Sequence, residues 1–358
     1  MSWWGDRLWF VGPGIVAAAV GLAIAAVDPR DEGYDESLAL WIVGVLLVDV
    51  AHVYASLYRT YFDPVARQRH RARLIWAPIL VAWFSFLLHL ESPLLFWGAL
   101  AYVAIFHFIK QHVGFAMLYA RGGHESATDR RLVASAVWAG TLAPVVWWHS
   151  RLPRQFAWFA QGDLVVGLPT WVGPVALLAT VPIWLAFAWR RGSLWRAGRG
   201  NPMVVWLTVV PAINWYLGIV VFNDDRIFTV TNVILHGVPY FALVWVAGGR
   251  ACVEQGLGRI TKRGVPPALL VALAFYGLLL ALAVGEEALW DRLIWHERAV
   301  LFGDGGTRLS PYATAAITAL LTVPQATHYL LDRWIWRAGP DNPALARQLG
   351  FAPREAPR

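Results

Sequence analysis

Long apolar runs separated by short polar segments dominate the sequence. A hydrocarbon core about 30 Å thick needs about 20 apolar residues in a helix, which advances about 1.5 Å per residue. Runs of this kind fall at 8–28, 37–58, 73–90, 93–120, 131–149, 171–190, 202–222, 227–248, 266–290 and 310–332. The pattern therefore predicts an all-α, polytopic integral membrane protein of about ten transmembrane helices.

The polar segments between these runs predict the orientation. Basic residues gather at 59–73, 121–131, 190–201 and 249–265 and near the C-terminus, whereas the segments at 28–36, 223–225 and 286–304 are acidic or mixed. Because Lys and Arg stay on the cytoplasmic side, we expect both termini to be cytoplasmic, which requires an even number of spans. We expect a bacterial cytoplasmic (inner) membrane, one transmembrane domain over 1–340 and a short cytoplasmic tail over 341–358.

Composition narrows the class of protein further. Hydrophobic residues make up 58% and charged residues 15% of the chain, against about 25% charged in a soluble domain. The net charge of +7 is explained by the cytoplasmic segments, so no nucleic-acid partner is predicted. The one cysteine, Cys252, excludes an internal disulfide and a cysteine-based zinc or iron–sulfur site. The first run, near the N-terminus, is interpreted as an uncleaved helix.

Five of the ten histidines lie inside apolar runs and away from the run ends occupied by His89 and His149, and all of the runs that hold these five are even-numbered. They are His52, His107, His112, His236 and His328. Even-numbered spans run in the same direction, so these side chains can share a similar depth, in the middle or inner half of the membrane. Ionisable groups are costly in a bilayer and usually mark function. The alternative is hydrogen bonding between helices, which histidine also supplies.

Each of these histidines has polar neighbours on its own helix. The residues concerned are Asp49, Gln111, Asn232, Gln325 and Asp332, mostly three or four positions from a histidine. Such spacing places two side chains on one helix face. A metal-bound imidazole commonly donates its second N–H to an oxygen, so these neighbours suit ligands or groups that orient ligands.

Roles follow from this arrangement as hypotheses. The predicted metal ligands are His52, His107, His112, His236, His328 and Asp332; the predicted cofactor contacts are Gln111 and Asn232; the predicted catalytic residues are Asp49, Lys110 and Gln325. Lys110 either extends to the headgroups or pairs with Asp49 or Asp332. His107 and His112 lie about 140° apart around a helix. Three alternatives are open. One of the two histidines orients a ligand without binding the metal itself, or the helix contains a bulge, or two metal ions bind.

The donor types limit the cofactor. Imidazoles with a few carboxylates and no thiolate suit Fe, Zn, Cu or Ni, and the set favours non-haem iron, with one or two ions. Haem b, which needs an axial histidine or a pair, is the alternative, in an electron-transfer or quinol-linked protein. A transporter with a His/Asp-lined site is a further alternative, although a transport path would place polar residues through the whole depth. The sequence contains no H-E-x-x-H zinc motif.

Two short motifs resemble the Brp/Blh-type β-carotene dioxygenases. They are Ile105-Phe106-His107-Phe108 and Leu321-Thr322-Val323-Pro324, the second followed by His328 and Asp332. Where that family has histidine directly after the proline, this chain has Gln325, and Asp49 precedes His52 where the family has His-Gly and then Asp. The resemblance implies iron held by intramembrane histidines. We therefore expect a membrane oxygenase or oxidoreductase that uses O₂ on an isoprenoid, lipid or hydrocarbon, with an external electron donor if the reaction consumes electrons.

Overall fold

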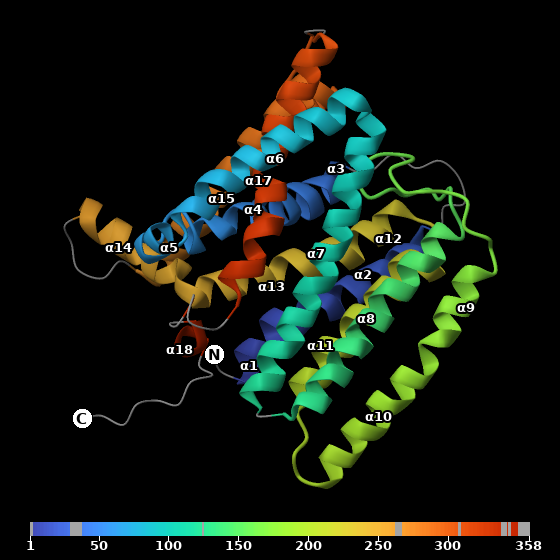
Figure 1. Cartoon of the computed structure of the whole chain (residues 1–358). Helices are drawn as coiled ribbons and strands as arrows, with labels where there is room; N and C mark the ends of the chain where they lie inside the picture. The colour runs from blue at the N-terminus through green and yellow to red at the C-terminus, as the bar shows by residue number, and fades with distance from the viewer. Residues whose placement is uncertain are drawn as a thin grey trace. The chain divides into compact units, whose positions relative to one another are not determined.

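The computed structural model describes residues 3–28, 38–123, 125–261, 267–306, 309–337, 342 and 345–349. Every element in these ranges is a helix (Figure 1), which confirms the all-α prediction. Within them, nine helices are long and apolar enough to cross a membrane. They are Arg7–Val27, Leu38–Arg59, Arg71–Glu91, Pro93–Gly122, Ala127–His149, Val172–Arg196, Pro202–Val221, Asp225–Arg259 and Ala268–Trp295. These nine match the first nine predicted runs, so multi-pass membrane character is supported.

Several of the nine helices combine α-helical and π-helical segments. The first half of the chain contains α1 (Trp3–Asp6), η1 (Arg7–Val11), α2 (Gly12–Val27), α3 (Leu38–Leu40), η2 (Trp41–Val50), α4 (Ala51–Ala55), η3 (Ser56–Arg59), α5 (Pro64–Arg69), α6 (Arg71–Glu91), α7 (Pro93–Gly122) and α8 (Ala127–His149). The second half contains α9 (Val172–Ala179), α10 (Val181–Arg196), α11 (Pro202–Trp215), η4 (Tyr216–Val221), α12 (Asp225–Thr229), η5 (Val230–Ile234), α13 (Leu235–Val244), η6 (Trp245–Gly249), α14 (Arg250–Thr261), α15 (Ala268–Trp290), η7 (Asp291–Trp295), α16 (Ala299–Phe302), α17 (Pro311–Ile335) and α18 (Leu345–Gln348). All η segments except the 3₁₀ turn η3 are π-helical.

The tenth predicted run forms α17, which is not among the nine apolar helices. It is 25 residues long, but four threonines together with Gln325, His328 and Asp332 reduce its hydropathy. Thr318, Thr322 and His328 are nevertheless buried. The polar side of α17 therefore faces protein, while apolar residues such as Leu320 are exposed.

Contacts divide the chain into two compact units. The described part of the first unit comprises the chain up to Gly44 and Ala101–Pro239. Within it, α8 packs against α9, α10 and α11, and α2 packs against α12 and η5. Small residues permit this packing: a Cβ added at Gly140 of α8 would lie 2.5 Å from the Cβ of Ala212 on α11. The helices of this unit are therefore held at close range.

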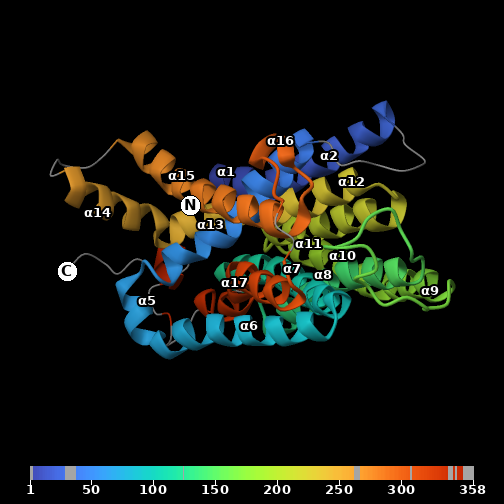
Figure 2. The ribbon, with the colours of Figure 1, turned by 90° about the horizontal axis from the view of Figure 1, so that it is seen from above.

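The second unit comprises Val45–Leu100 and the chain from Tyr240 onward. Its main pairing is between α6 and α17, which run side by side (Figures 1 and 2). α4 packs against α15 and also contacts α17. The second unit therefore places α4 directly beside α17, and each of these two helices carries one of the five histidines of the apolar runs.

Part of the predicted organisation lies outside the described residues. The loop residues 29–37 and 262–266 are among these, as is most of the predicted tail over 341–358. In that tail, the Asn342 and Gln348 side chains accept hydrogen bonds from the buried guanidinium of Arg59. The single domain over 1–340 and the cytoplasmic termini stay predictions.

Candidate metal centre

One pair of histidines lies within the first unit. His107 comes from the regular α-helix α7, and His236 comes from the first turn of α13, directly after the π-helical segment η5. Their ring centroids are 5.1 Å apart. His236 is fully buried and His107 is 6% exposed. Two helices distant in sequence therefore direct their imidazoles toward one place.

Two residues of α7 hold His236 in position. The Gln111 amide Nε2 donates a 2.8 Å hydrogen bond to the backbone carbonyl of His236. The Phe108 ring stacks on the His236 ring at a centroid distance of 3.6 Å and an interplanar angle of 6°. The backbone bond fixes the helix and the stacked ring fixes the plane of the imidazole, so both α7 contacts restrict the direction of its nitrogens.

A second pair lies within the second unit. His52 is on α4, which follows the π-helical segment η2, and His328 is on α17. The two ring centroids are 5.2 Å apart and the rings are nearly perpendicular, at 83°. Both side chains are buried, and each residue is only 1% exposed. π-helical winding is frequent at functional sites because it changes the direction of side chains, and here it precedes both His52 and His236.

A carboxylate lies near the Nδ1 atom of each ring of the second pair. The Oδ1 of Asp49 lies 3.7 Å from Nδ1 of His52, and the Oδ1 of Asp332 lies 3.6 Å from Nδ1 of His328. Both separations exceed a good hydrogen bond but bring the carboxylates into range of the ring. A carboxylate at this nitrogen orients an imidazole ligand when the two form a hydrogen bond.

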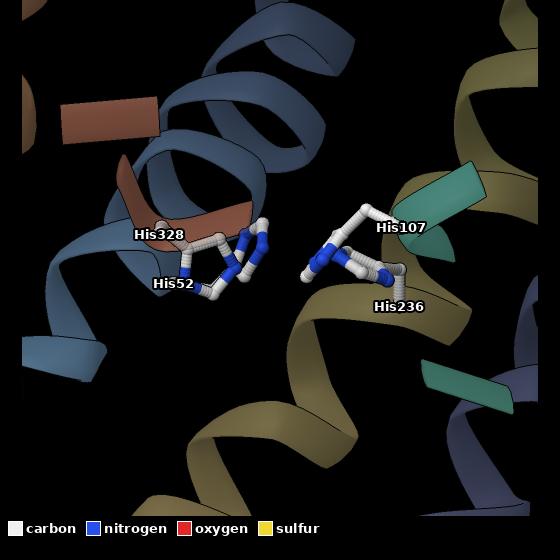
Figure 3. Close-up of side chains that lie close together, drawn as sticks. All are labelled: His52, His107, His236 and His328. Atoms are coloured by element: carbon white, nitrogen blue, oxygen red, sulfur yellow. The ribbon is translucent and has the colours of Figure 1, made fainter. Parts of the chain in front are cut away.

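The four histidines of the two pairs also form one group (Figure 3). One ring nitrogen from each of His52, His107, His236 and His328 lies within 4.8 Å of the other three, and all four residues are buried. Among the described residues this is the group of His, Cys, Asp and Glu side chains that has the spacing of a metal site. All four are among the predicted metal ligands.

The other predicted site residues lie elsewhere. His112 is buried but outside the group, and its Nε2 accepts a 3.3 Å hydrogen bond from Trp215 Nε1. Lys110 is exposed on α7. The Gln325 amide donates to the hydroxyl of Tyr329 on its own helix, and the Asn232 amide donates to a backbone carbonyl of its own helix, that of Phe228. Asp49 and Asp332 adjoin the group without belonging to it.

Two residues that contact these histidines were not among the predicted site residues. Phe108 stacks on His236, and the Tyr240 ring lies 5.6 Å from the His52 ring and 5.0 Å from the His328 ring. Tyr240 follows His236 by four positions, just as Asn232 precedes it by four. This three-residue polar stripe is visible in the sequence, whereas the role of Phe108 depends on how the helices pack.

Comparison of the chain with protein-family models, with curated proteins and with solved structures finds no match. The resemblance to carotene dioxygenases therefore stays a prediction, and the function is interpreted from the site's own residues.

Proposed function

We propose that His52, His107, His236 and His328 bind one metal ion. Their ligand atoms lie within 4.8 Å of one another. Four nitrogens around one ion, at bonds of about 2.1 Å, would lie about 3.4 Å apart in a tetrahedron. Side-chain rotations that move each nitrogen by a few tenths of an ångström to about 1 Å would bring the four nitrogens to this spacing. The four-histidine group carries this proposal, because four buried imidazoles from four separate helices bring ligand atoms within 4.8 Å of one another.

The ion that fits the proposed activity is non-haem iron. Imidazole is a good ligand for Fe, Cu, Zn and Ni, and only the redox-active ions among them support an oxygenase. When bound, iron would supply the binding and activation of O₂. The chain's own residues would exclude water and orient the ligands, with Phe108 and Tyr240 forming aromatic walls beside the histidines. The resulting function is a membrane-embedded oxygenase or related oxidoreductase.

The substrate class follows from the surroundings of the site. The histidines lie in helices apolar enough to span a membrane, apart from the more polar α17. A substrate that reaches such a site through the bilayer must itself be apolar, so we propose a lipid, isoprenoid or hydrocarbon. The motif resemblance favours the same class. Haem b is less well supported, because its axial ligands need a macrocycle between them, whereas these four nitrogens converge on one small space.

The membrane arrangement is part of the proposal. We propose that α17 is the tenth span, since its length is sufficient and its polar side is buried against protein. With ten spans and basic segments on the cytoplasmic side, we propose that both termini are cytoplasmic and that the membrane is the inner membrane of a bacterial cell. The histidines then lie in the inner part of the membrane.

Single substitutions to alanine test the ligand set. His52→Ala, His107→Ala, His236→Ala and His328→Ala should each lower the iron content of the purified protein at least several-fold, because a lost ligand leaves three nitrogens. Two controls are available. His112→Ala removes a buried histidine outside the group, and His89→Ala removes a buried histidine of α6; both should retain iron. Equal retention of iron by all six variants, with intact folding, would overturn the four-histidine centre.

A further inference from the structure

Tyr240 is a buried tyrosine whose hydroxyl has no role in the proposed function. It lies on α13 and is 0% exposed. A hydroxyl removed from water costs free energy unless it finds a hydrogen-bond partner. Tyr240 finds one in Asp332, to whose Oδ1 the phenol donates at 2.6 Å. The short distance is typical of a hydroxyl bonded to a carboxylate.

The acceptor oxygen connects this bond to a histidine. The same atom, Asp332 Oδ1, lies 3.6 Å from Nδ1 of His328. Asp332 and His328 are one turn apart on α17, whereas Tyr240 comes from α13. The phenol therefore restrains the carboxylate from a second helix, against rotation away from the imidazole. All of these residues lie in the second unit.

We propose that Tyr240 is a positioning residue for the metal centre, acting on His328 through Asp332. This inference rests on the proposed function. A carboxylate held at Nδ1 favours the tautomer that carries its proton there, which leaves Nε2 as the metal ligand. Tyr240 stabilises that arrangement by keeping Asp332 in place.

The Tyr240 ring and its hydroxyl have separable effects. The ring packs edge-on against His52 and His328, at interplanar angles of 77° and 84°. Tyr240→Phe keeps these ring contacts and removes the hydroxyl, and with it the bond to Asp332. Tyr58→Phe is a matched control, because Tyr58 is also buried in the second unit, and its hydroxyl donates to a backbone carbonyl, that of Phe275.

The test compares Co²⁺ binding by the detergent-purified protein and four variants. The variants are Tyr240→Phe, Asp332→Asn, the two combined, and Tyr58→Phe. Loss of a group that orients a ligand typically costs about 10- to 100-fold in metal affinity, so Tyr240→Phe and Asp332→Asn should each weaken binding by about 10-fold or more. Because Tyr240 acts through Asp332, the double variant should lose no more than Asp332→Asn alone. The visible Co²⁺ spectrum should change in the same variants, whereas Tyr58→Phe should match the original protein.

Three outcomes would count against the inference. Unchanged affinity and spectrum in Tyr240→Phe would overturn it, as would losses that multiply in the double variant. An equal loss in Tyr58→Phe would show a general effect of removing a buried hydroxyl. These results are distinct from failure of the proposed function, in which the original protein would itself bind no Co²⁺.

Discussion

At the scale of single residues, burial and helix rotation together decide which histidines can share one metal ion. A polar residue in an apolar run is visible in any sequence, and the cost of burying it points to function. Which rings converge depends on the rotation of each helix. His107 and His112 lie about 140° apart on one helix, and packing directs His107 into the group while His112 faces Trp215.

Gln111 provides a prediction at this scale. Gln111→Met keeps the length of the side chain but removes the amide that bonds the His236 carbonyl. A hydrogen bond between helices in a membrane contributes about 0.6 kcal/mol on average and up to about 1.7 kcal/mol. Thermal unfolding in detergent should therefore show a loss of about 1 kcal/mol, together with weaker metal binding as His236 gains freedom.

The control for Gln111 is Gln255→Met on α14, where the side chain is exposed. It should leave both the unfolding temperature and the metal affinity unchanged. If Gln111→Met behaves like this control, the α7 to α13 bond has no part in holding His236.

At the scale of helices, hydropathy predicts where the long helices lie in the sequence, but it does not predict which segments of them are π-helical. The first nine apolar runs correspond to the nine long apolar helices, because the length of a span is set by the thickness of the membrane. The π-helical segments η2 and η5 gave no sequence signal, since they arise where packing forces an extra residue into a turn. α17 also shows that burial of a polar face, which sequence alone does not display, lets a less apolar helix pack in this protein.

Close helix packing gives a prediction for the first unit. The new methyl group in Gly140→Ala would meet the Cβ of Ala212 at 2.5 Å and the Trp184 ring at 2.8 Å. α8 would have to move from α11, and overpacking of this kind typically costs about 1–3 kcal/mol. The loss should appear as a lower midpoint of thermal unfolding in detergent.

Gly114 on α7 supplies the comparison, because a Cβ there would meet nothing within 4 Å. Gly114→Ala should be neutral or slightly stabilising, as alanine has the higher helix propensity. Equal midpoints for the two alanine variants would contradict the close approach of α8 and α11.

At the scale of the whole molecule, the charge of the loops predicts an orientation that contacts alone do not test. Labelling with a membrane-impermeant maleimide in intact bacterial cells tests it. In a Cys252→Ser background, Gln161→Cys lies in an exposed segment between the fifth and sixth predicted runs, which a cytoplasmic N-terminus puts outside, and Ala197→Cys lies in a basic segment predicted to be inside. Gln161→Cys should label at once and Ala197→Cys only after the cells are permeabilised. The opposite pattern would invert the topology.

The four-histidine metal centre is the central claim, and metal analysis of the purified protein tests it most directly. The protein would be expressed with ample iron, purified in detergent, and examined by elemental analysis and by optical spectroscopy of the same sample. We predict about one iron per chain, held by imidazole ligands, and no Soret band. A Soret band would assign the histidines to haem. The absence of any bound metal would contradict the metal centre and leave the four histidines as hydrogen-bonding groups between helices.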